Sequence, residues 1–350
     1  MNFKYTSYPN QVFFGKGKTE ELPEILKEYK KVMAFGEERW STQIEAVGNA
    51  IGGNKLYYFP EIIQHVPQQL VDKAMEKLKE EKPDVLLAFG GGSSIGLAKA
   101  LALETKLPII AVPTTYSGSE QTNIWGVSTE EGKTTGKSMD VMPKVVVYDS
   151  DLTAGLPLSL AVTSGMNAMA HLMEAIYAPN GNPVTRHHAL LGVEKIKSGL
   201  EEVAKNQSLT ESANVDIQFG AYLAGKCLCE VSMSLHHKMA HVLGGSFKLE
   251  HSYVHTVLQA FVLNYQWEYL SDEIKRDFTQ VLGHQPAHKL QELSSQAGGP
   301  TDLKSIGFKR EDINKAVEIV LAKPYENVAP LEKAKLVDML VHAYEGSLEG

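Results

Sequence analysis

The chain has few cysteines, no long apolar runs and no excess of positive charge. It contains 350 residues but only two cysteines, Cys227 and Cys229. Helical residues two positions apart point about 200° away from each other, so this pair cannot form a disulfide on one helix. So few thiols are typical of proteins of the reducing cytoplasm, where we expect this one to reside.

The missing apolar runs and the charge exclude two classes of partner. No apolar segment approaches the roughly 18 residues of a membrane span, and the first residues lack the apolar stretch of a signal peptide. With a formal net charge of −8, the chain has no overall positive field to attract nucleic acid or an anionic membrane. The length is typical of two globular domains or one large one. Because the charge and the missing apolar runs disfavour nucleic acid and membrane as partners, we expect a small-molecule ligand.

Two kinds of pattern meet near residue 152. Before it, short β-rich segments alternate with amphipathic helical ones, which indicates a parallel sheet with helices on both faces. The predicted strands cover residues 31–35, 55–59, 84–89, 108–112 and 144–148. An extended segment at 3–14 and a hairpin at 123–138, turning at Glu131-Gly132 near the edge of the sheet, complete this half.

After residue 152 only helical patterns follow. They cover residues 163–178, 187–205, 215–228, 234–243, 256–265, 280–296 with an interruption at Pro286, 310–322 and 333–344. The sequence therefore predicts an α/β domain over residues 1–152 and an all-helical domain over residues 153–350. Such a pair of domains commonly leaves a ligand-binding cleft between them.

A glycine-rich turn follows the third predicted strand and opens a helix. Gly91, Gly92, Ser93 and Ser94 form this turn after Gly90. Glycines allow close approach of an anion to the backbone, and a helix N-terminus offers unpaired N–H groups. The pattern is not the G-x-G-x-x-G of the usual dinucleotide fold. A ligand-free turn has the same composition, but the position after a buried strand favours a pyrophosphate site.

Two further segments are candidates for the same dinucleotide. The hydroxyl-rich segment after the fourth strand supplies Thr114, Thr115, Ser117 and Ser119, although a capping turn explains these residues equally well. Glu37 ends the first strand, where a carboxylate can accept hydrogen bonds from a ribose diol and repel a 2′-phosphate. It favours NADH over NADPH, unless it is only an exposed loop carboxylate.

Histidines are concentrated in the second half of the chain. Twelve occur, and five of them fall within residues 236–255. Three polar pairs have the i, i+4 spacing that shares one helix face: Asn167 with His171, His237 with His241, and His251 with His255. A break at Gly244-Gly245 is expected to bring two of these faces together. One histidine alone is typically a core residue, whereas three such pairs favour a polar or metal site.

These motifs, in this order, resemble the iron-containing alcohol dehydrogenase superfamily, which includes glycerol dehydrogenases and dehydroquinate synthases. The matching strings are Gly90-Gly91-Gly92-Ser93, Pro113-Thr114-Thr115, Gly118-Ser119-Glu120, Gly165-Met166-Asn167-Ala168-x-x-His171, and His237-x-x-x-His241-x-x-Gly244 with His251. The resemblance implies a Rossmann-like N-terminal domain and an all-α C-terminal domain.

The resemblance also implies a ligand set for a metal. Metal-dependent members use one Asp and three His, at positions that are Asn167, His171, His237 and His251 here. A neutral amide oxygen is a poorer ligand than a carboxylate. We therefore expect that no metal is required, while zinc or iron at these four residues remains an alternative.

Several local strings resemble the maleylacetate reductase branch of that superfamily. They are Trp125-Gly126, Lys133-Thr134-Thr135-Gly136, Ser164-Gly165-Met166-Asn167-Ala168 and Leu235-His236-His237-Lys238. The branch implies reduction of maleylacetate to 3-oxoadipate with NADH or NADPH, and a homodimer. It implies catalytic roles for His241 and His237, a pocket completed by His171, His251, Asn167, Lys238 and Tyr325, and Lys133 beside the cofactor.

Three departures from the branch leave other functions open. Glu250 replaces a Pro, Ala329 replaces an Arg that could clamp a carboxylate, and Asn123 replaces a Pro. The alternatives are a metal-dependent alcohol or aldehyde dehydrogenase acting on another small carbonyl compound, a lyase like dehydroquinate synthase, and a non-catalytic dinucleotide sensor.

Overall fold

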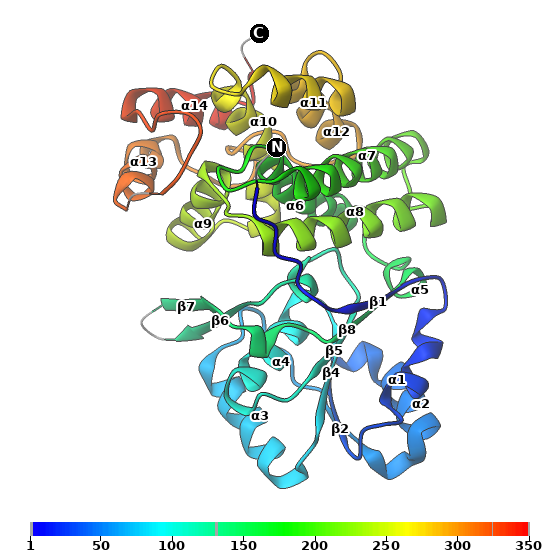
Figure 1. The fold of residues 1–350 in the computed structure, drawn as a ribbon. Coiled ribbons are helices and arrows are strands. Elements are labelled where there is room, and N and C mark those ends of the chain that lie inside the picture. Colours follow the sequence, from blue (N-terminus) through cyan, green and yellow to red (C-terminus); the bar gives the residue numbers. More distant parts are fainter. Residues whose placement is uncertain (1–2, 130–131, 324, 349–350) are drawn as a thin grey trace. The chain divides into compact units, whose positions relative to one another are not determined.

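The computed structural model describes residues 3–129, 132–323 and 325–348, which form two compact units (Figure 1). The sheet unit comprises Ser7–Gly155, and the helical unit comprises the chain from Leu156 onward together with the segment before Ser7. The chain therefore passes between the units twice. The sequence analysis placed the domain boundary after residue 152 and assigned residues 1–6 to the sheet domain. In the structure the segment before Ser7 belongs to the helical unit, where Tyr5 hydrogen-bonds to Glu230 at 2.9 Å.

The sheet unit contains a six-stranded parallel sheet. Its order is β1 (Gln11–Gly15), β8 (Val145–Asp149), β5 (Ile109–Pro113), β4 (Val85–Gly90), β2 (Val32–Phe35) and β3 (Leu56–Phe59). The five strands predicted from the sequence are confirmed. The extended N-terminal segment forms β1, which pairs with β8 of its own chain at the end of the sheet.

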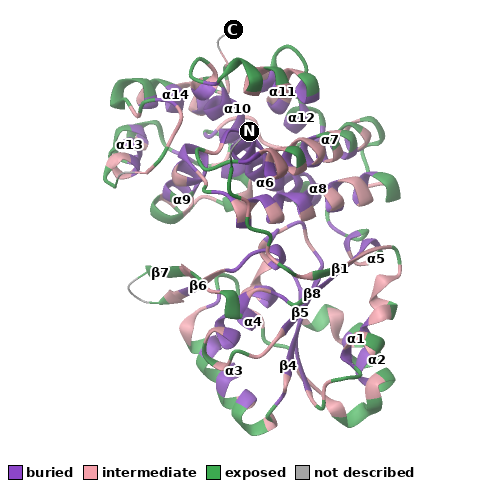
Figure 2. Cartoon of the chain, viewed as in Figure 1, coloured by how far each residue is buried: buried purple, intermediate pink, exposed green. Residues whose placement is uncertain are grey.

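Helices cover both faces of this sheet, as the alternation of segments predicts. They are α1 (Leu22–Leu26), α2 (Ser41–Gly52), α3 (Gln68–Glu81), α4 (Gly92–Thr105) and the short α5 (Ser150–Thr153). Val85, Leu87 and Phe89 of β4 pack with residues of α1 and α2. The intervening Leu86 and Ala88 point to the other face, where α4 packs. Every residue of β4 is therefore buried, which explains its unbroken apolar sequence (Figure 2).

The strand order reverses direction beside β2, which pairs with β3 on one side and β4 on the other. Ligands of open α/β sheets bind outside the carboxyl ends of the strands at such a reversal. Gly36 follows β2 there, and a Cβ on it would lie 2.6 Å from Ile44 Cδ1 and 2.7 Å from the carbonyl oxygen of Phe89. Glycine is therefore required where the ends of β2 and β4 meet.

The predicted hairpin forms, but its place differs from the prediction. β6 (Ile124–Thr129) and β7 (Gly132–Lys137) pair as a separate antiparallel sheet. β6 packs on α3 and α4, and the backbone N–H of Ser128 donates to Val66 at 3.1 Å. The hairpin thus rests on a helical layer rather than at the sheet edge. Of the predicted turn, Glu131 lies outside the described residues.

The helical unit is built from nine described α-helices. They are α6 (Leu158–Tyr177), α7 (Pro183–Asn206), α8 (Glu211–Glu230), α9 (Leu235–Phe247), α10 (His251–Trp267), α11 (Asp272–Leu282), α12 (Pro286–Gln296), α13 (Ile313–Leu321) and α14 (Lys333–Glu345). The predicted interruption at Pro286 is confirmed, because α12 begins there. Among the described residues, no helix combines the length and hydropathy needed to cross a membrane.

Helix α6 is the core of this unit. It packs against α7, α8 and α10, and nearly all its residues from Ala161 to Tyr177 are buried, as the purple α6 in Figure 2 shows. Glycines bring α7 and α8 close together: a Cβ on Gly220 would lie 2.4 Å from Ile196 Cγ1. Polar side chains on α6 are therefore surrounded by neighbouring helices, and each needs a specific partner.

Gly36 provides a test of the sheet packing. We expect Gly36→Ala to lower the free energy of unfolding by about 1–3 kcal/mol, because the added methyl group meets a backbone carbonyl that cannot move aside. Thermal unfolding by calorimetry measures the effect. Gly155→Ala is the matched control, since a Cβ there meets nothing within 4 Å. Equal unfolding midpoints for the two variants would contradict the packing described.

Candidate active site

The glycine turn at the end of β4 has the features of an anion site. Gly91 precedes α4, and no side chain caps the first turn of this helix. A Cβ on Gly91 would lie 3.2 Å from the side chain of Thr115, and one on Gly92 would lie 3.5 Å from Ser117 Cβ. The structure therefore brings the two predicted cofactor segments together, with the helix N–H groups of α4 available to a phosphate.

Two hydroxyl groups at this turn, Ser94 Oγ and Thr114 Oγ1, are buried and have no hydrogen-bond partner within the described part of the chain. Buried polar atoms in native proteins are normally paired. The glycine cradle, the uncapped helix and these two hydroxyls together fit the pyrophosphate of a nicotinamide dinucleotide. Gly91, Gly92, Ser93 and Ser94 would hold it, and the bound dinucleotide would supply a hydride.

A buried lysine that sequence reasoning missed supports the hydroxyl-rich segment. Lys99 of α4 is 1% exposed, and its Nζ donates to the carbonyls of Ser119 and Thr122, each at 2.6 Å, and of Ile124 at 2.9 Å. The buried Glu120 accepts from Tyr148 Oη at 2.7 Å. Lys99 and Glu120 therefore hold the segment beside the glycine turn. A charged residue within the apolar sequence of α4 was the available clue.

The structure shows Glu37 already paired. It follows β2, as predicted, and its carboxylate lies 2.6 Å from Arg39 Nε in a half-exposed ion pair. Arg39 also lies 5.2 Å from the centre of the Trp40 ring. An acid and a base are thus both present where a ribose would lie, so Glu37 alone does not determine the choice between NADH and NADPH. The side chain of Lys133 lies outside the described residues.

In the helical unit, six histidines from three helices meet. They are His171 of α6, His236, His237 and His241 of α9, and His251 and His255 of α10. His171 and His237 have ring centres 4.6 Å apart, and those of His241 and His251 are 6.0 Å apart. His241 and His251 are exposed, whereas the other four are buried. The predicted i, i+4 pairs therefore converge on one cluster.

The predicted break between these helices was placed wrongly. Gly244 and Gly245 lie inside α9, which continues to Phe247 and ends at Lys248, with a φ of 58°. A Cβ on Gly244 would lie 3.6 Å from His251 Nδ1. Gly244 of α9 therefore lies beside His251, and residues 248–250 make the turn instead.

A buried carboxylate, Glu174, organises the start of α9. It accepts the backbone N–H of Ser234 at 2.9 Å and that of His236 at 2.8 Å, and it lies 2.7 Å from His237 Nδ1. Burial raises the pKa of this carboxyl, and the neighbouring His236 and the backbone N–H groups at the start of α9 oppose that rise. Sequence reasoning missed Glu174, although it lies three residues after His171 on an otherwise apolar helix.

Three of the histidines form a hydrogen-bonded chain. His236 Nε2 lies 2.8 Å from His255 Nδ1, and His255 Nε2 lies 3.1 Å from His251 Nε2. Burial lowers the pKa of His236 to about 3 and the pKa values of His171, His237 and His255 well below their usual range. The buried rings are therefore neutral near pH 7, and each carries one N–H. His236 and His255 were not among the predicted site residues.

Five polar atoms at the cluster are buried without a partner among the described residues. They are Asn167 Oδ1, His171 Nδ1, His236 Nδ1, His237 Nε2 and Tyr325 Oη. Burial raises the pKa of Tyr325, so its hydroxyl keeps its proton. Lys238 Nζ lies 5.9 Å from the centre of the Tyr325 ring. Unpaired donors and acceptors of this kind indicate a site for a small polar ligand.

The predicted metal ligands do not fit a divalent ion as they are arranged. Asn167 offers a neutral oxygen, and His251 Nε2 is engaged by His255. In the part of the chain that the structure describes, no three His, Cys, Asp or Glu side chains are grouped as metal ligands. Asn167, His171 and His237 are instead neutral hydrogen-bonding groups.

The three departures from the branch have structural explanations. Glu250 caps α10, because its Oε2 accepts the Tyr253 N–H at 2.9 Å. The buried Ala329 is held through its backbone, which donates to Gln266 at 2.9 Å. Asn123 is buried in the segment before the hairpin, and its backbone carbonyl accepts the N–H of Ser138. Glu250 is thus engaged with its own helix.

Comparison with known proteins places this fold and site in a family. The model of the iron-containing alcohol dehydrogenase family matches residues 9–150, and that of the Fe-containing alcohol dehydrogenase family C-terminal domain matches residues 161–344. The chain belongs to the iron-containing alcohol dehydrogenase family.

Within that family, the relatives indicate the maleylacetate reductase branch. Maleylacetate reductase of Pseudomonas sp. (strain P51) is 38% identical over 348 residues, 99% of each chain, and that of Burkholderia cepacia is 38% identical over 339 residues, 96% of each. The crystal structure of maleylacetate reductase from Agrobacterium tumefaciens is 32% identical, with a TM-score of 0.95 over 99% of each chain.

The buried neutral histidines predict a loss of stability in mild acid. In the unfolded chain each histidine takes up a proton near pH 6.5, which the folded chain resists. The unfolded state therefore binds more protons below that pH. We expect the free energy of unfolding to fall as the pH drops below about 6.5, by up to about 1.4 kcal/mol per pH unit for each such histidine.

Denaturant unfolding between pH 7.5 and 5 measures this dependence. His236→Gln should make it shallower, because one buried ring is lost. His284→Asn removes an exposed histidine and should leave it unchanged. The same pH dependence in both variants would show that the buried ring of His236 does not resist protonation.

Proposed function

We propose that this protein reduces maleylacetate to 3-oxoadipate with NADH or NADPH. The observation that carries the proposal is the neutral polar cluster, with Asn167 where metal-dependent members of the family have a carboxylate ligand. Full-length relatives that are named maleylacetate reductases support it. The glycine cradle of the sheet unit supports a dinucleotide as the second reactant.

The chemistry suits a site without a metal. The substrate is a ketone conjugated to a C=C bond, so hydride addition to the alkene carbon remote from the ketone places negative charge on the ketone oxygen as an enolate. Because this charge is delocalised, hydrogen-bond donors can stabilise it. One proton then reaches the carbon next to the ketone, which completes 3-oxoadipate and NAD(P)⁺. We propose that no metal is required.

The residues divide these tasks. Tyr325 Oη keeps its proton and is unpaired, so it is a donor for the enolate oxygen. His241 lies at the exposed end of the cluster and is the candidate proton donor to carbon. Asn167, His171, His237 and His251 line the pocket, and Lys238 supplies positive charge for a substrate carboxylate.

Assembly and location are further parts of the proposal. β1 is the terminal strand of the sheet, so its outer edge is available for pairing with a second copy in a homodimer. Cys227 and Cys229 are both buried thiols that form no disulfide among the described residues. Unoxidised thiols agree with a cytoplasmic enzyme.

The decisive assay follows NADH or NADPH oxidation with maleylacetate on protein freshly treated with a chelator. Turnover without added metal is the expected result, because the proposed donors are side chains. Activity that appears only after zinc or iron is added would instead assign Asn167, His171, His237 and His251 to a metal. No turnover in either state would exclude maleylacetate as the substrate.

A single substitution tests the role of His241. His241→Ala should lower kcat at least about 100-fold, since general acid catalysis typically contributes that much, while NADH binding, followed by fluorescence titration, stays unchanged. The control is His284→Ala, which changes an exposed residue in the turn between α11 and α12 and should retain full kcat. Retention of activity in His241→Ala would remove this residue from the mechanism.

A further inference from the structure

The strongest unassigned feature is the buried carboxylate of Glu174. Its side chain is 1% exposed, and that of its partner His237 is 7% exposed. Three nitrogen atoms surround the Glu174 carboxylate. Two are backbone N–H groups at the start of α9, and the third is His237 Nδ1. Two of these contacts, Ser234 N–H and His237 Nδ1, share the oxygen Oε2.

This arrangement determines which nitrogen of His237 carries the proton. Each oxygen of Glu174 accepts a backbone N–H, an arrangement that favours the ionised carboxylate. A carboxylate only accepts hydrogen bonds, so the ring donates from Nδ1. The ring is 7% exposed and lies 4.6 Å from the His171 ring and 4.9 Å from the His255 ring, surroundings that favour an uncharged imidazole. A neutral imidazole carries one N–H, so Nε2 then has a lone pair and no proton. Nε2 is also the ring atom that is buried without a partner. The nitrogen that faces the ligand site is therefore an acceptor.

We propose that Glu174 is a positioning residue that holds His237 as its Nδ1–H tautomer, with Nε2 presented to the ligand as an acceptor. The consequence for the reaction rests on the proposed function. A neutral His237 cannot donate to the enolate oxygen through Nε2, so that task belongs to other groups such as Tyr325 Oη. The expected catalytic role of His237 is thereby narrowed to that of a hydrogen-bond acceptor.

The same carboxylate aligns the backbone. Glu174 lies on α6, and its bonds to Ser234 and His236 determine where α9 begins. His237 follows directly, so its ring orientation depends on both the backbone and the side-chain bond. Removing the carboxylate would release the tautomer and the ring together, whereas a purely structural carboxylate would affect stability alone.

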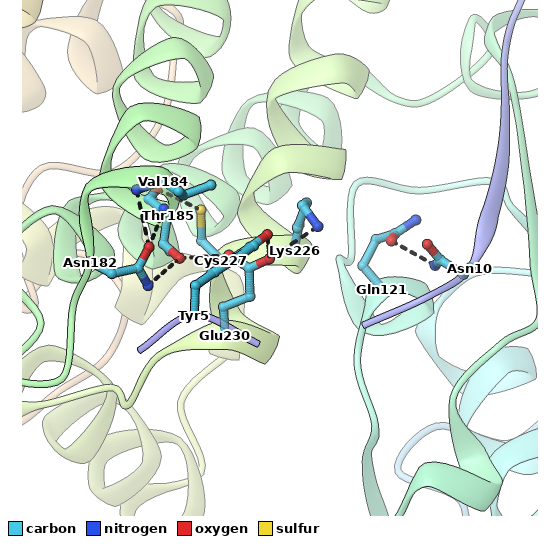
Figure 3. A network of polar contacts seen from close by, with 9 residues as sticks. All are labelled: Tyr5, Asn10, Gln121, Asn182, Val184, Thr185, Lys226, Cys227 and Glu230. Carbon is cyan, nitrogen blue, oxygen red and sulfur yellow. Dashed lines mark hydrogen bonds and ion pairs between the residues drawn. The ribbon is translucent and has the colours of Figure 1, made fainter. Parts of the chain in front are cut away.

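The chain offers a matched control in Glu230 of α8. Its side chain is also 1% exposed, and it also has three partners: Tyr5 Oη at 2.9 Å, Thr185 Oγ1 at 2.6 Å and Lys226 Nζ at 3.0 Å (Figure 3). None of these partners is a histidine. Substitutions of Glu230 therefore remove an equally buried carboxylate without changing a ring of the cluster.

The first measurement requires no activity. Nitrogen-15 NMR of the wild-type protein labelled at histidine, with His237→Gln to assign the signals, reports the protonation of each ring nitrogen. We expect protonated Nδ1 and unprotonated Nε2 for His237. A protonated Nε2 in the wild-type protein would overturn the proposal, even if no variant of Glu174 folds.

The second measurement compares kinetics. Glu174→Leu should lower kcat about 100-fold, because partners that orient a ligating or catalytic histidine typically contribute this much. Glu174→Gln keeps one acceptor oxygen and should lower kcat about 10-fold. In both variants we expect KM to change less than kcat. Glu230→Leu and Glu230→Gln should keep kcat within a few-fold. Equal kcat losses in the two series would show that Glu174 is merely structural. If wild-type protein does not turn over maleylacetate, the proposed function fails, and the NMR result still decides the role of Glu174.

Discussion

The hydrogen bonds of one buried carboxylate determine the arrangement of the histidine cluster. Glu174 lies on α6, the most buried helix of its unit, and binds two backbone N–H groups and one imidazole at the start of α9. A buried carboxylate is stable only when such donors surround it. The start of α9, and with it the positions of His236 and His237, is therefore coupled to α6.

The cluster is a low-charge environment despite its six titratable rings. Burial keeps four of them neutral, and Asn167 adds an amide where a carboxylate would serve a cation. Neutral donors and acceptors can bind a delocalised anion without a large cost of burying charge. An anionic ligand strengthens the binding of a divalent ion, but Asn167 is neutral and the neighbouring Glu174 is already occupied by N–H donors. The composition of the site thus suits an enolate better than a metal.

The sheet unit contains a buried positive charge that is also compensated by hydrogen bonds to the backbone. Lys99 is buried in α4, and three backbone carbonyls compensate its ammonium group. These bonds hold the segment whose Thr115 and Ser117 face the glycine turn. In both units, a buried charged group orders a polar segment by satisfying the backbone. The ligand-facing atoms, Ser94 Oγ and Thr114 Oγ1 in one unit and His237 Nε2 in the other, remain unpaired.

The sequence by itself determined the features that depend on local periodicity. Apolar strands alternating with helices specified the parallel sheet, Pro286 specified a helix start, and the i, i+4 spacing placed Asn167 beside His171 and His237 beside His241. These patterns are local because helix and strand geometry repeats within a few residues. Motif resemblance added the family, which the comparisons confirm.

Only the tertiary structure decided which groups meet across helices. Glu174 and His237 are 63 positions apart, and Lys99 and Ile124 are 25 apart, so no local pattern pairs them. The sequence placed the turn between α9 and α10 at Gly244-Gly245, but both glycines lie inside α9, which ends at Lys248. The hairpin likewise rests on α3 and α4 rather than at the sheet edge. The physical reason is that burial makes each polar group depend on partners that only the folded chain brings within hydrogen-bonding distance.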